Sequence, residues 1–421
     1  MAWAFFIVSV LGVVHAVNAL NPRKRPVAIF AWSFFASWLT IELVWHHVVI
    51  GLLWTALFVT GGALDSPVGV VALALMVVAE AILVSIGLTT RKTKVIVGTA
   101  LADLAPGPDA PRFPRSHVVL PLLMKRRQGV TVKRNIEFAR ASGKVQKLDV
   151  TIPSVPVPGG GTKRPALLQI HGGGWVIGDK REQGIPLLNH MAAQGWVGFN
   201  ANYRLSPGAT FPDHLVDCKK ALAWIREHAD EYGIDPDFIC VTGGSAGGHL
   251  TALMGTTAND PRFQPGFETA DTTVTAAVPF YGLYDFTPNG TFGADPEIYK
   301  MFLEPMVMKA FVAEEPEKYD EASPLHHLDA HVPAFFVIHG DKDTLAPVED
   351  ARVFVEALRG ISQQPVAYAE MQGAQHAFEI FPSVRAARVI EGVERFLTTL
   401  WERRQAPART QEAELAEALT D

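Results

Sequence analysis

The sequence has little cysteine and no excess of positive charge. Cys218 and Cys240 are its only two cysteines, and their places in a predicted helix and a predicted strand suit small buried side chains. Two such residues do not make a disulfide framework. The formal net charge is −6, so the broad basic surface of a nucleic-acid-binding protein is not expected. We therefore expect no nucleic acid partner.

The first 90 residues also have few charges, with only three basic and three acidic side chains. Met1–Leu20 and Val68–Leu88 are each apolar and long enough to cross a bilayer. Val27–Leu64 is too long for one helix and just long enough for two short ones. A cleaved signal peptide fits less well, because no basic residue precedes the first apolar run and further apolar runs follow. Residues 1–90 are thus predicted to form a multi-pass membrane anchor of three or four helices, in a bacterial cell membrane.

Two basic clusters bear on the orientation of this anchor. Arg23–Arg25 and Arg91–Lys94 both favour the cytoplasmic side. They share a side if Val27–Leu64 crosses once, whereas two crossings would place them on opposite sides and the rest of the chain outside. Both arrangements stay open. Residues 91–130 are basic and contain the proline-rich Ala105–Pro114, which predicts a semi-rigid linker beside the membrane.

From residue 131 to 403, strand-like runs alternate with helical ones. This alternation predicts an α/β fold with a mainly parallel sheet covered by helices on both faces. Functional residues should then lie on loops at the carboxyl ends of the strands. Residues 404–421 are predicted to be a polar tail that frays or contains a short helix at Glu412–Leu419. The expected strands are Val130–Phe138 and Val145–Ile152 as an edge pair, then Ala166–Ile170, Val197–Asn202, Phe238–Val241, Val274–Phe280, Ala334–Ile338 and Val366–Glu370.

A glycine-rich turn lies between one predicted strand and the helix that follows it. The strand Phe238–Val241 leads to Gly243-Gly-Ser-Ala-Gly247, and a predicted helix follows. Strand, tight turn, serine and helix form the context of a nucleophile elbow. The small residues allow strand and helix to approach closely, and the helix N-terminus directs backbone N–H groups at a developing oxyanion. Ser245 is the candidate nucleophile, whereas a plain glycine turn with a capping serine is the competing interpretation.

A second glycine run, His171-Gly-Gly-Gly-Trp175, follows the predicted strand Ala166–Ile170. Backbone N–H groups in such a run are unshielded and can face a ligand. Hydrolases of this layout use them as part of the oxyanion hole. We assign that role to the N–H groups of Gly173, Gly174 and Ala246. Trp175 and Tyr281 are candidates for the substrate pocket, and His171 is expected to shape its loop.

An acid and a histidine should follow the serine in that order. Asp341 and Asp343 both lie on the loop after the strand Ala334–Ile338. His376 lies on the loop after the last predicted strand, where it can take the proton of Ser245. His339 and His249 do not fit the order and are expected to be structural.

These motifs together resemble the α/β-hydrolase esterases of the hormone-sensitive-lipase and feruloyl-esterase-like group. The resemblance covers about residues 145 to 400, aligns Asp343 as the acid, and implies carboxylic ester hydrolysis through an acyl-enzyme without metal or cofactor. The anchor is reminiscent of actinobacterial membrane-bound lipases. Gly244 stands where the lipase-like branch often has Asp, which favours the feruloyl-esterase-like branch. The matching motifs are His171–Lys180, Asn202–Pro207, Gly243–Leu250, His339–Asp343 and Gly373–Phe378.

The expected substrate is a hydrophobic ester or lipid. An amidase or peptidase with the same triad is one alternative, and a membrane sensor with an inactive hydrolase domain is another. Arg204 is expected to pair with a buried carboxylate such as Asp217. Ile298–Phe311 is either a lid over the pocket or a helix packed on the sheet. The oligomeric state is left open.

Overall fold

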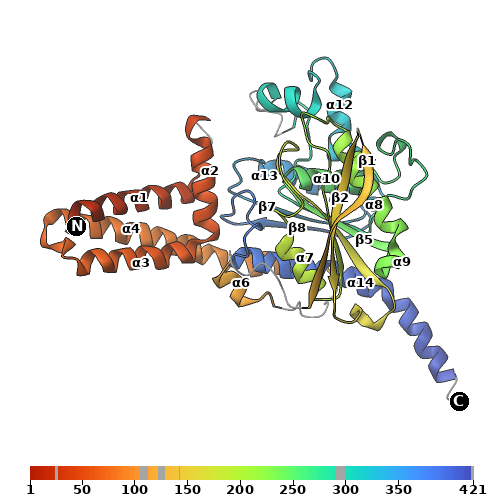
Figure 1. Ribbon diagram of the computed structural model, residues 1–421, viewed down its shortest axis with the longest axis horizontal. Helices are drawn as coiled ribbons and strands as arrows, with labels where there is room; N and C mark the ends of the chain where they lie inside the picture. The colour runs from red at the N-terminus through yellow and green to blue at the C-terminus, as the bar shows by residue number, and fades with distance from the viewer. Residues whose placement is uncertain (24–26, 105–111, 122–128, 142, 291–298, 419–421) are drawn as a thin grey trace.

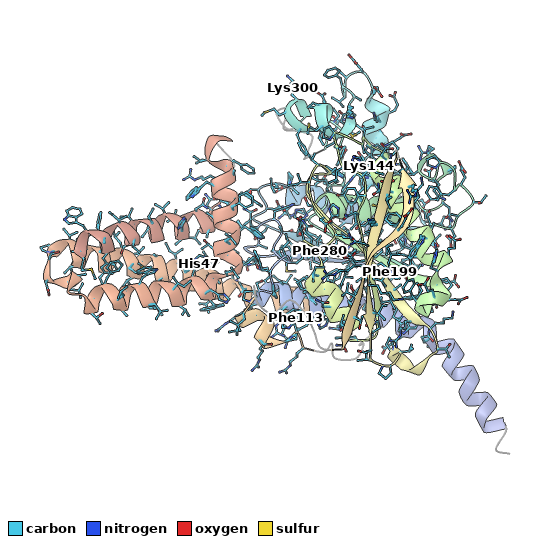
Figure 2. The ribbon with its side chains drawn as sticks, in the orientation of Figure 1. His47, Phe113, Lys144, Phe199, Phe280 and Lys300 are labelled. Atoms are coloured by element: carbon cyan, nitrogen blue, oxygen red, sulfur yellow. The ribbon has the colours of Figure 1, made fainter. Side chains whose placement is uncertain are left out.

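The computed structural model describes residues 1–23, 27–104, 112–121, 129–141, 143–290 and 299–418. A group of N-terminal helices lies beside a larger domain built around one sheet (Figure 1). Phe199 and Phe280 mark the interior of the larger domain in Figure 2, and both are buried. The predicted fold class is confirmed by the sheet order and strand directions given below.

Three N-terminal helices run side by side and a fourth crosses their end (Figure 1). The three are α1 (Ala2–Leu20), α3 (Val44–Thr60) and α4 (Pro67–Thr90). Helix α2 (Val27–Glu42) stands between this bundle and the sheet domain, and the α2–α3 pair is bent by 90°. Two helical stretches are long and apolar enough to span a membrane, or three if the bent pair counts as one span. Of the expected three or four spans, three agrees with this count, and only if the bent pair forms one span.

Part of the predicted linker belongs to the core of the sheet domain. Helix α5 (Thr93–Ala100) follows α4 almost directly and packs on helix α14 (Val384–Ala418) and strand β8 (Val366–Met371). Val97 and Leu101 are buried in the same cluster as residues of the sheet, and so is Phe113. These apolar side chains remove water from one face of the sheet, so this segment is not a solvated spacer. Residues 105–111 of the proline-rich run lie outside the described residues, and helix α6 covers Arg115–Val119.

The sheet has eight strands in the order β1-β2-β4-β3-β5-β6-β7-β8. The β1–β2 and β2–β4 pairs are antiparallel, which confirms the predicted edge pair, and all other neighbours are parallel. The carboxyl ends of the parallel strands therefore meet at one edge. The strands are β1 (Val130–Ala141), β2 (Lys144–Pro153), β3 (Arg164–Ile170), β4 (Val197–Ala201), β5 (Ile234–Gly244), β6 (Ala276–Phe280), β7 (Ala334–Gly340) and β8 (Val366–Met371).

Helices cover both faces of the sheet, as expected for parallel strands. One buried cluster joins the sheet to α8, α10 and α13, and the other joins it to α5, α7 and α14. Cys218 and Cys240 are free and buried, one in each cluster, as predicted. The helices are α7 (Ile185–Ala192), α8 (Asp213–Glu227), α9 (Ala229–Tyr232), α10 (Ala246–Thr256), α12 (Pro316–Glu321), α13 (Val348–Ile361) and α14 (Val384–Ala418).

The C-terminal tail differs from its expected form. Helix α14 continues without interruption to Ala418, so the predicted polar tail is helical over most of its length. Residues 405–418 are rich in alanine, glutamate and glutamine, which have high helix propensity.

Candidate active site

Ser245 lies on a sharp turn between β5 and α10. Its backbone has φ 59° and ψ −122°, a conformation that non-glycine residues rarely adopt. A methyl group at Gly247 would lie 2.2 Å from the carbonyl oxygen of Ile170, and one at Gly243 would lie 2.5 Å from the same oxygen. Both glycines are thus required because β3 passes close to the turn. Backbone strain at a residue held this firmly is a common property of functional sites.

The acid loop after β7 meets the histidine loop after β8. Nδ1 of His376 lies 2.6 Å from Oδ2 of Asp343. The other oxygen of Asp343 accepts hydrogen bonds of 2.8 Å from the N–H groups of Leu345 and Ala346. Asp341 instead accepts a hydrogen bond from the N–H of Gly373, at 2.6 Å. Asp343 is therefore the carboxylate that contacts the predicted histidine.

Asp343 is fully buried yet remains charged. Burial by itself would raise its pKa, but attraction to His376 and hydrogen bonds with His339 and His376 outweigh it, and the pKa lies well below the ordinary value. His339, expected to be structural, contributes here, since its Nε2 lies 3.4 Å from Oδ2 of Asp343 and 3.0 Å from the carbonyl oxygen of Ala346. Two imidazoles thus flank one carboxylate.

Ser245 and His376 line a common cavity with a volume of about 510 Å³. Gly173 and Gly174 of the glycine run also line it, as do the two predicted pocket residues, Trp175 and Tyr281. Ala246 begins α10 and is buried beside the serine. The other residues around the cavity are mostly apolar: Phe34, Phe35, Trp38, Ile177, Gln183, Leu283, Phe302, Leu345, Ala346, Ala377 and Ile380.

The glycine run is held by polar contacts from both sides. The N–H of Gly172 donates to Oε1 of Gln183 at 2.7 Å. His171 stacks on Tyr203 with ring centroids 4.5 Å apart, and its Nδ1 lies 2.8 Å from the carbonyl oxygen of Gly172. Gly173 and Gly174 have φ angles of +112° and +59°, which favour glycine. His171 therefore shapes its loop, as predicted.

Tyr281 accounts for the glycine before Ser245. Its ring lies 4.4 Å from the ring of His376, and its hydroxyl donates a hydrogen bond to Glu379. A methyl group at Gly244 would lie 2.6 Å from that hydroxyl oxygen. Burial raises the pKa of Glu379 to about 7. The aspartate common in the lipase-like branch would thus collide with Tyr281 here.

His249 is structural, as predicted. Its Nδ1 accepts a hydrogen bond from the indole N–H of Trp175 at 3.2 Å, and its Nε2 donates to the carbonyl oxygen of Ala322 at 2.7 Å. Burial lowers the pKa of His249 to about 3. This neutral imidazole fixes Trp175 against the cavity.

Ile298–Phe311, considered as a lid, is packed on the domain over much of its described part. Tyr299–Met308 forms a π-helix whose Leu303 and Val307 are buried in the core. Phe302 on the same segment lines the cavity. Ile298 lies outside the described residues.

Arg204 and Asp217 form the predicted buried pair. Nε of Arg204 lies 2.8 Å from Oδ2 of Asp217, and Nη2 lies 2.9 Å from Oδ1. The side chain of Asp217 is fully buried. This bidentate contact ties the loop after β4 to α8.

Replacing Arg204 with alanine is expected to lower the free energy of unfolding by about 3–5 kcal/mol, because Asp217 would keep a buried and unpaired charge. The measurement is denaturant unfolding of the detergent-solubilised protein. Lys133→Ala, which removes a cation from an exposed pair with Glu231, is the control and should change stability by less than about 1 kcal/mol. A large loss of activity with unchanged stability would contradict a scaffold role for Arg204.

Two features of the site were not predicted. Glu379 was missed because it carries no motif, and the cavity residues from α2 were missed because they lie more than 130 residues upstream of the first hydrolase motif. Among the residues that the structure describes, no group of three or more histidine, cysteine or carboxylate side chains could hold a metal ion.

Comparison with known proteins indicates the family to which this chain belongs. The profile of the BD-FAE family matches residues 148–358. Over 237 residues, 56% of this chain and 54% of the relative, the sequence is 52% identical to the probable carboxylic ester hydrolase LipM of Mycobacterium tuberculosis. It is 45% identical over 244 residues to the esterase LipQ of the same organism, covering 58% of this chain and 57% of the relative. The match thus spans about half the length of these curated relatives.

A solved structure has a similar fold. The butyrate-bound esterase Est2 of Thermogutta terrifontis has a TM-score of 0.54 and 26% identity, with 64% of this chain and 94% of that chain covered. The covered share of this chain is about the size of the sheet domain. The predicted resemblance is confirmed. Because the family profile spans half of the sequence, this chain belongs to the BD-FAE family and has the α/β-hydrolase fold of the hormone-sensitive-lipase-like esterases.

Proposed function

We propose that this protein is a membrane-anchored serine hydrolase that cleaves carboxylic esters. The observation that carries the proposal is the meeting of three loops at one cavity, with Ser245 on its strained turn and His376 held by Asp343. These are the groups that acyl transfer through a serine requires. The esterase names of the relatives support the same reaction class.

The chemistry follows from the roles of the three side chains. Oγ of Ser245 attacks the ester carbonyl carbon while Nε2 of His376 takes the hydroxyl proton, and the carbonyl oxygen becomes an oxyanion. The C–O bond to the alcohol then breaks, and the protonated His376 gives its proton to the departing alkoxide. Water repeats the sequence on the acyl-enzyme and releases the acid. Asp343 holds the tautomer of His376 and stabilises its charged form.

The oxyanion is expected to be bound by backbone N–H groups of Gly173, Gly174 and Ala246. The first two line the cavity with Ser245, and the third is the first residue of α10. Removing one such donor typically costs about 10²–10³-fold in kcat. The left-handed backbone of the two glycines supports this role, because it permits a turn with unshielded amides.

The exposed surface of the N-terminal helices supports the proposal that they anchor the protein in a membrane. Their outward side chains include many large apolar residues, such as Leu53 at 65% exposed and Val77 at 59% exposed. Such a surface suits lipid. If α1, α3 and α4 cross, the ends that carry Arg23 and Arg91 both lie toward the catalytic domain, because α2 and α5 at these ends contact it. The distribution of positive charge then favours a cytoplasmic catalytic domain.

Covalent labelling tests the proposal. The full chain, purified in detergent, is treated with a fluorophosphonate probe, and the modified residue is located by peptide mass spectrometry. We expect one adduct, on Ser245, together with hydrolysis of p-nitrophenyl butyrate. An adduct elsewhere, or labelling without turnover of esters, would contradict the proposal, and faster turnover of matched anilides than of esters would favour the amidase alternative.

A further inference from the structure

Helix α2 forms one wall of the catalytic cavity. Phe34, Phe35 and Trp38 lie around the same space as Ser245 and His376. The ring of Phe34 lies 6.4 Å from the imidazole of His376. The wall thus comes from the N-terminal helices and not from the part of the chain that matches the family.

Helix α2 is fastened to the loop that carries the catalytic histidine. The indole N–H of Trp38 donates to the carbonyl oxygen of Ala377 at 2.9 Å, and its ring stacks on Phe381 at 5.0 Å. The side chain of Gln375 donates to Oγ of Ser37 at 3.2 Å. These contacts involve residues on both sides of His376 in the sequence.

A buried ion pair fixes the end of the helix. Oε1 of Glu42 lies 3.2 Å from Nη1 of Arg385, and both side chains are fully buried. Oε2 of Glu42 accepts a hydrogen bond from Ser383 at 2.7 Å. Because a buried charge is costly without its partner, moving Glu42 of α2 away from Arg385 is unfavourable.

The outer side of α2 is apolar and exposed. Ile29, Trp32, Phe35 and Leu39 have 41%, 47%, 55% and 37% of their surface accessible. Phe35 is both exposed and part of the cavity lining, so the cavity reaches the outer side of the helix. Two further lining residues, Ile177 at 69% and Leu345 at 39%, extend this exposed apolar rim on the sheet domain.

The position of α2 indicates what this apolar rim meets. The helix crosses the end of the α1, α3 and α4 bundle, with a 90° bend before α3 (Figure 1). If the bundle spans a bilayer, α2 lies in the plane of the membrane at its surface. A helix in that plane can bury its exposed apolar side chains among head groups and acyl chains.

We propose that α2 is the acyl-binding wall of the active site and the point where substrate enters from the membrane. This inference rests on the proposed esterase function and specifies its substrate class as a long-chain acyl ester resident in the bilayer. The ester moves past Phe35 into the cavity, its chain packs on Phe34 and Trp38, and its carbonyl carbon reaches Ser245. Phe34 and Trp38 are then residues that determine chain-length specificity.

The first test compares chain lengths. Full-length protein in vesicles of phosphatidylcholine is assayed with p-nitrophenyl palmitate and p-nitrophenyl butyrate, and active sites are counted by fluorophosphonate labelling. Phe34→Ala and Trp38→Ala are each expected to lower the palmitate-to-butyrate ratio of kcat/KM by about tenfold or more, because lost apolar contacts in a pocket change discrimination by 10–200-fold. Trp54→Ala, an exposed tryptophan on α3 outside the cavity, is the matched control.

Three outcomes are distinguishable. A wild type that neither reacts with the probe nor cleaves either ester would overturn the proposed function itself. Equal ratios in wild type, Phe34→Ala and Trp38→Ala, with wild type active, would overturn only the role of α2. Phe34→Trp guards against misfolding, because a larger ring should shift preference toward the shorter ester while the labelled fraction stays high.

The second test concerns delivery. A long-chain diacylglycerol, which exchanges slowly between vesicles, is placed either in the vesicles that contain the protein or in separate vesicles at the same total concentration. Hydrolysis is expected to be at least tenfold faster in the shared vesicles. Equal rates would mean that substrate arrives through water, and entry along α2 would be refuted.

Discussion

Replacing Ser245 with alanine is expected to lower kcat for ester hydrolysis by about 10⁶-fold, the scale seen when a triad loses its nucleophile. Alanine keeps Cβ, so the turn at φ 59° carries the same backbone strain and the fold should be retained. What disappears is the oxygen that forms the acyl-enzyme. Residual rates come from the oxyanion donors and binding alone.

The measurement is single-substrate kinetics with p-nitrophenyl butyrate and probe labelling under identical conditions. Ser362→Ala removes a hydroxyl at the end of α13, where Oγ of Ser362 donates to the carbonyl oxygen of Gln364 in the same loop at 3.2 Å. This control should keep wild-type rates. More than about one per cent of wild-type activity in Ser245→Ala, against the expected scale, would show that another nucleophile operates.

Replacing Asp343 with asparagine is expected to lower kcat by about 10⁴-fold, because the wrong tautomer of His376 would be stabilised. An amide can present its oxygen to the N–H groups of Leu345 and Ala346 and its NH₂ to Nδ1 of His376. Nδ1 then accepts a hydrogen bond from the amide, so the proton of the neutral imidazole lies on Nε2. With Nε2 already protonated, His376 cannot take the proton of Ser245. The geometry is kept while the base is lost.

Asp341→Asn is the matched control for this substitution. Asp341 lies two residues away, bonds to the N–H of Gly373, and has a pKa raised by burial. Its replacement should reduce kcat by less than about tenfold, which corresponds to a rise of less than about 1.4 kcal/mol in the activation free energy. Equal losses in the two variants would contradict the assignment of Asp343.

The depressed pKa of Asp343 also sets the sign of a stability effect. A carboxyl with a folded pKa below its unfolded one contributes stability above the unfolded pKa and loses that contribution as pH falls through the folded pKa. Asp343 therefore stabilises the native protein at neutral pH. Asp343→Asn removes that contribution, so the stability gap between wild type and variant should close at strongly acidic pH.

The positions of the three candidate loops could be predicted from the sequence because each follows a short apolar strand. Parallel strands bring distant loops to one edge, so Ser245, Asp343 and His376 could be placed together without knowledge of side-chain geometry. The choice between Asp341 and Asp343 needed the family resemblance, since two residues on one loop look alike in sequence. The structure shows that Asp341 accepts a hydrogen bond from the N–H of Gly373 instead of contacting His376.

The contacts between the N-terminal helices and the domain could not be predicted. Apolar runs such as Val27–Leu64 read as membrane spans, because composition cannot distinguish lipid from a protein cavity as the partner of an apolar side. Val97 in α5 was assigned to a linker for a related reason, since the basic residues around it outweighed a short apolar stretch. Glu42 lies in the apolar run Val27–Leu64, and its partner Arg385 is more than 340 residues away in the sequence.

Because the cavity wall on α2 lies outside the hydrolase motifs, substrate preference and the reaction itself can change independently. The motifs proposed to perform the reaction lie in the matched segment 148–358 and just beyond it, whereas Phe34 and Trp38 lie far upstream. Substitutions in this helix can reshape the cavity while every hydrolase motif stays intact. Two relatives with identical motifs can therefore prefer different substrates, and grouping them by those motifs alone would hide this difference.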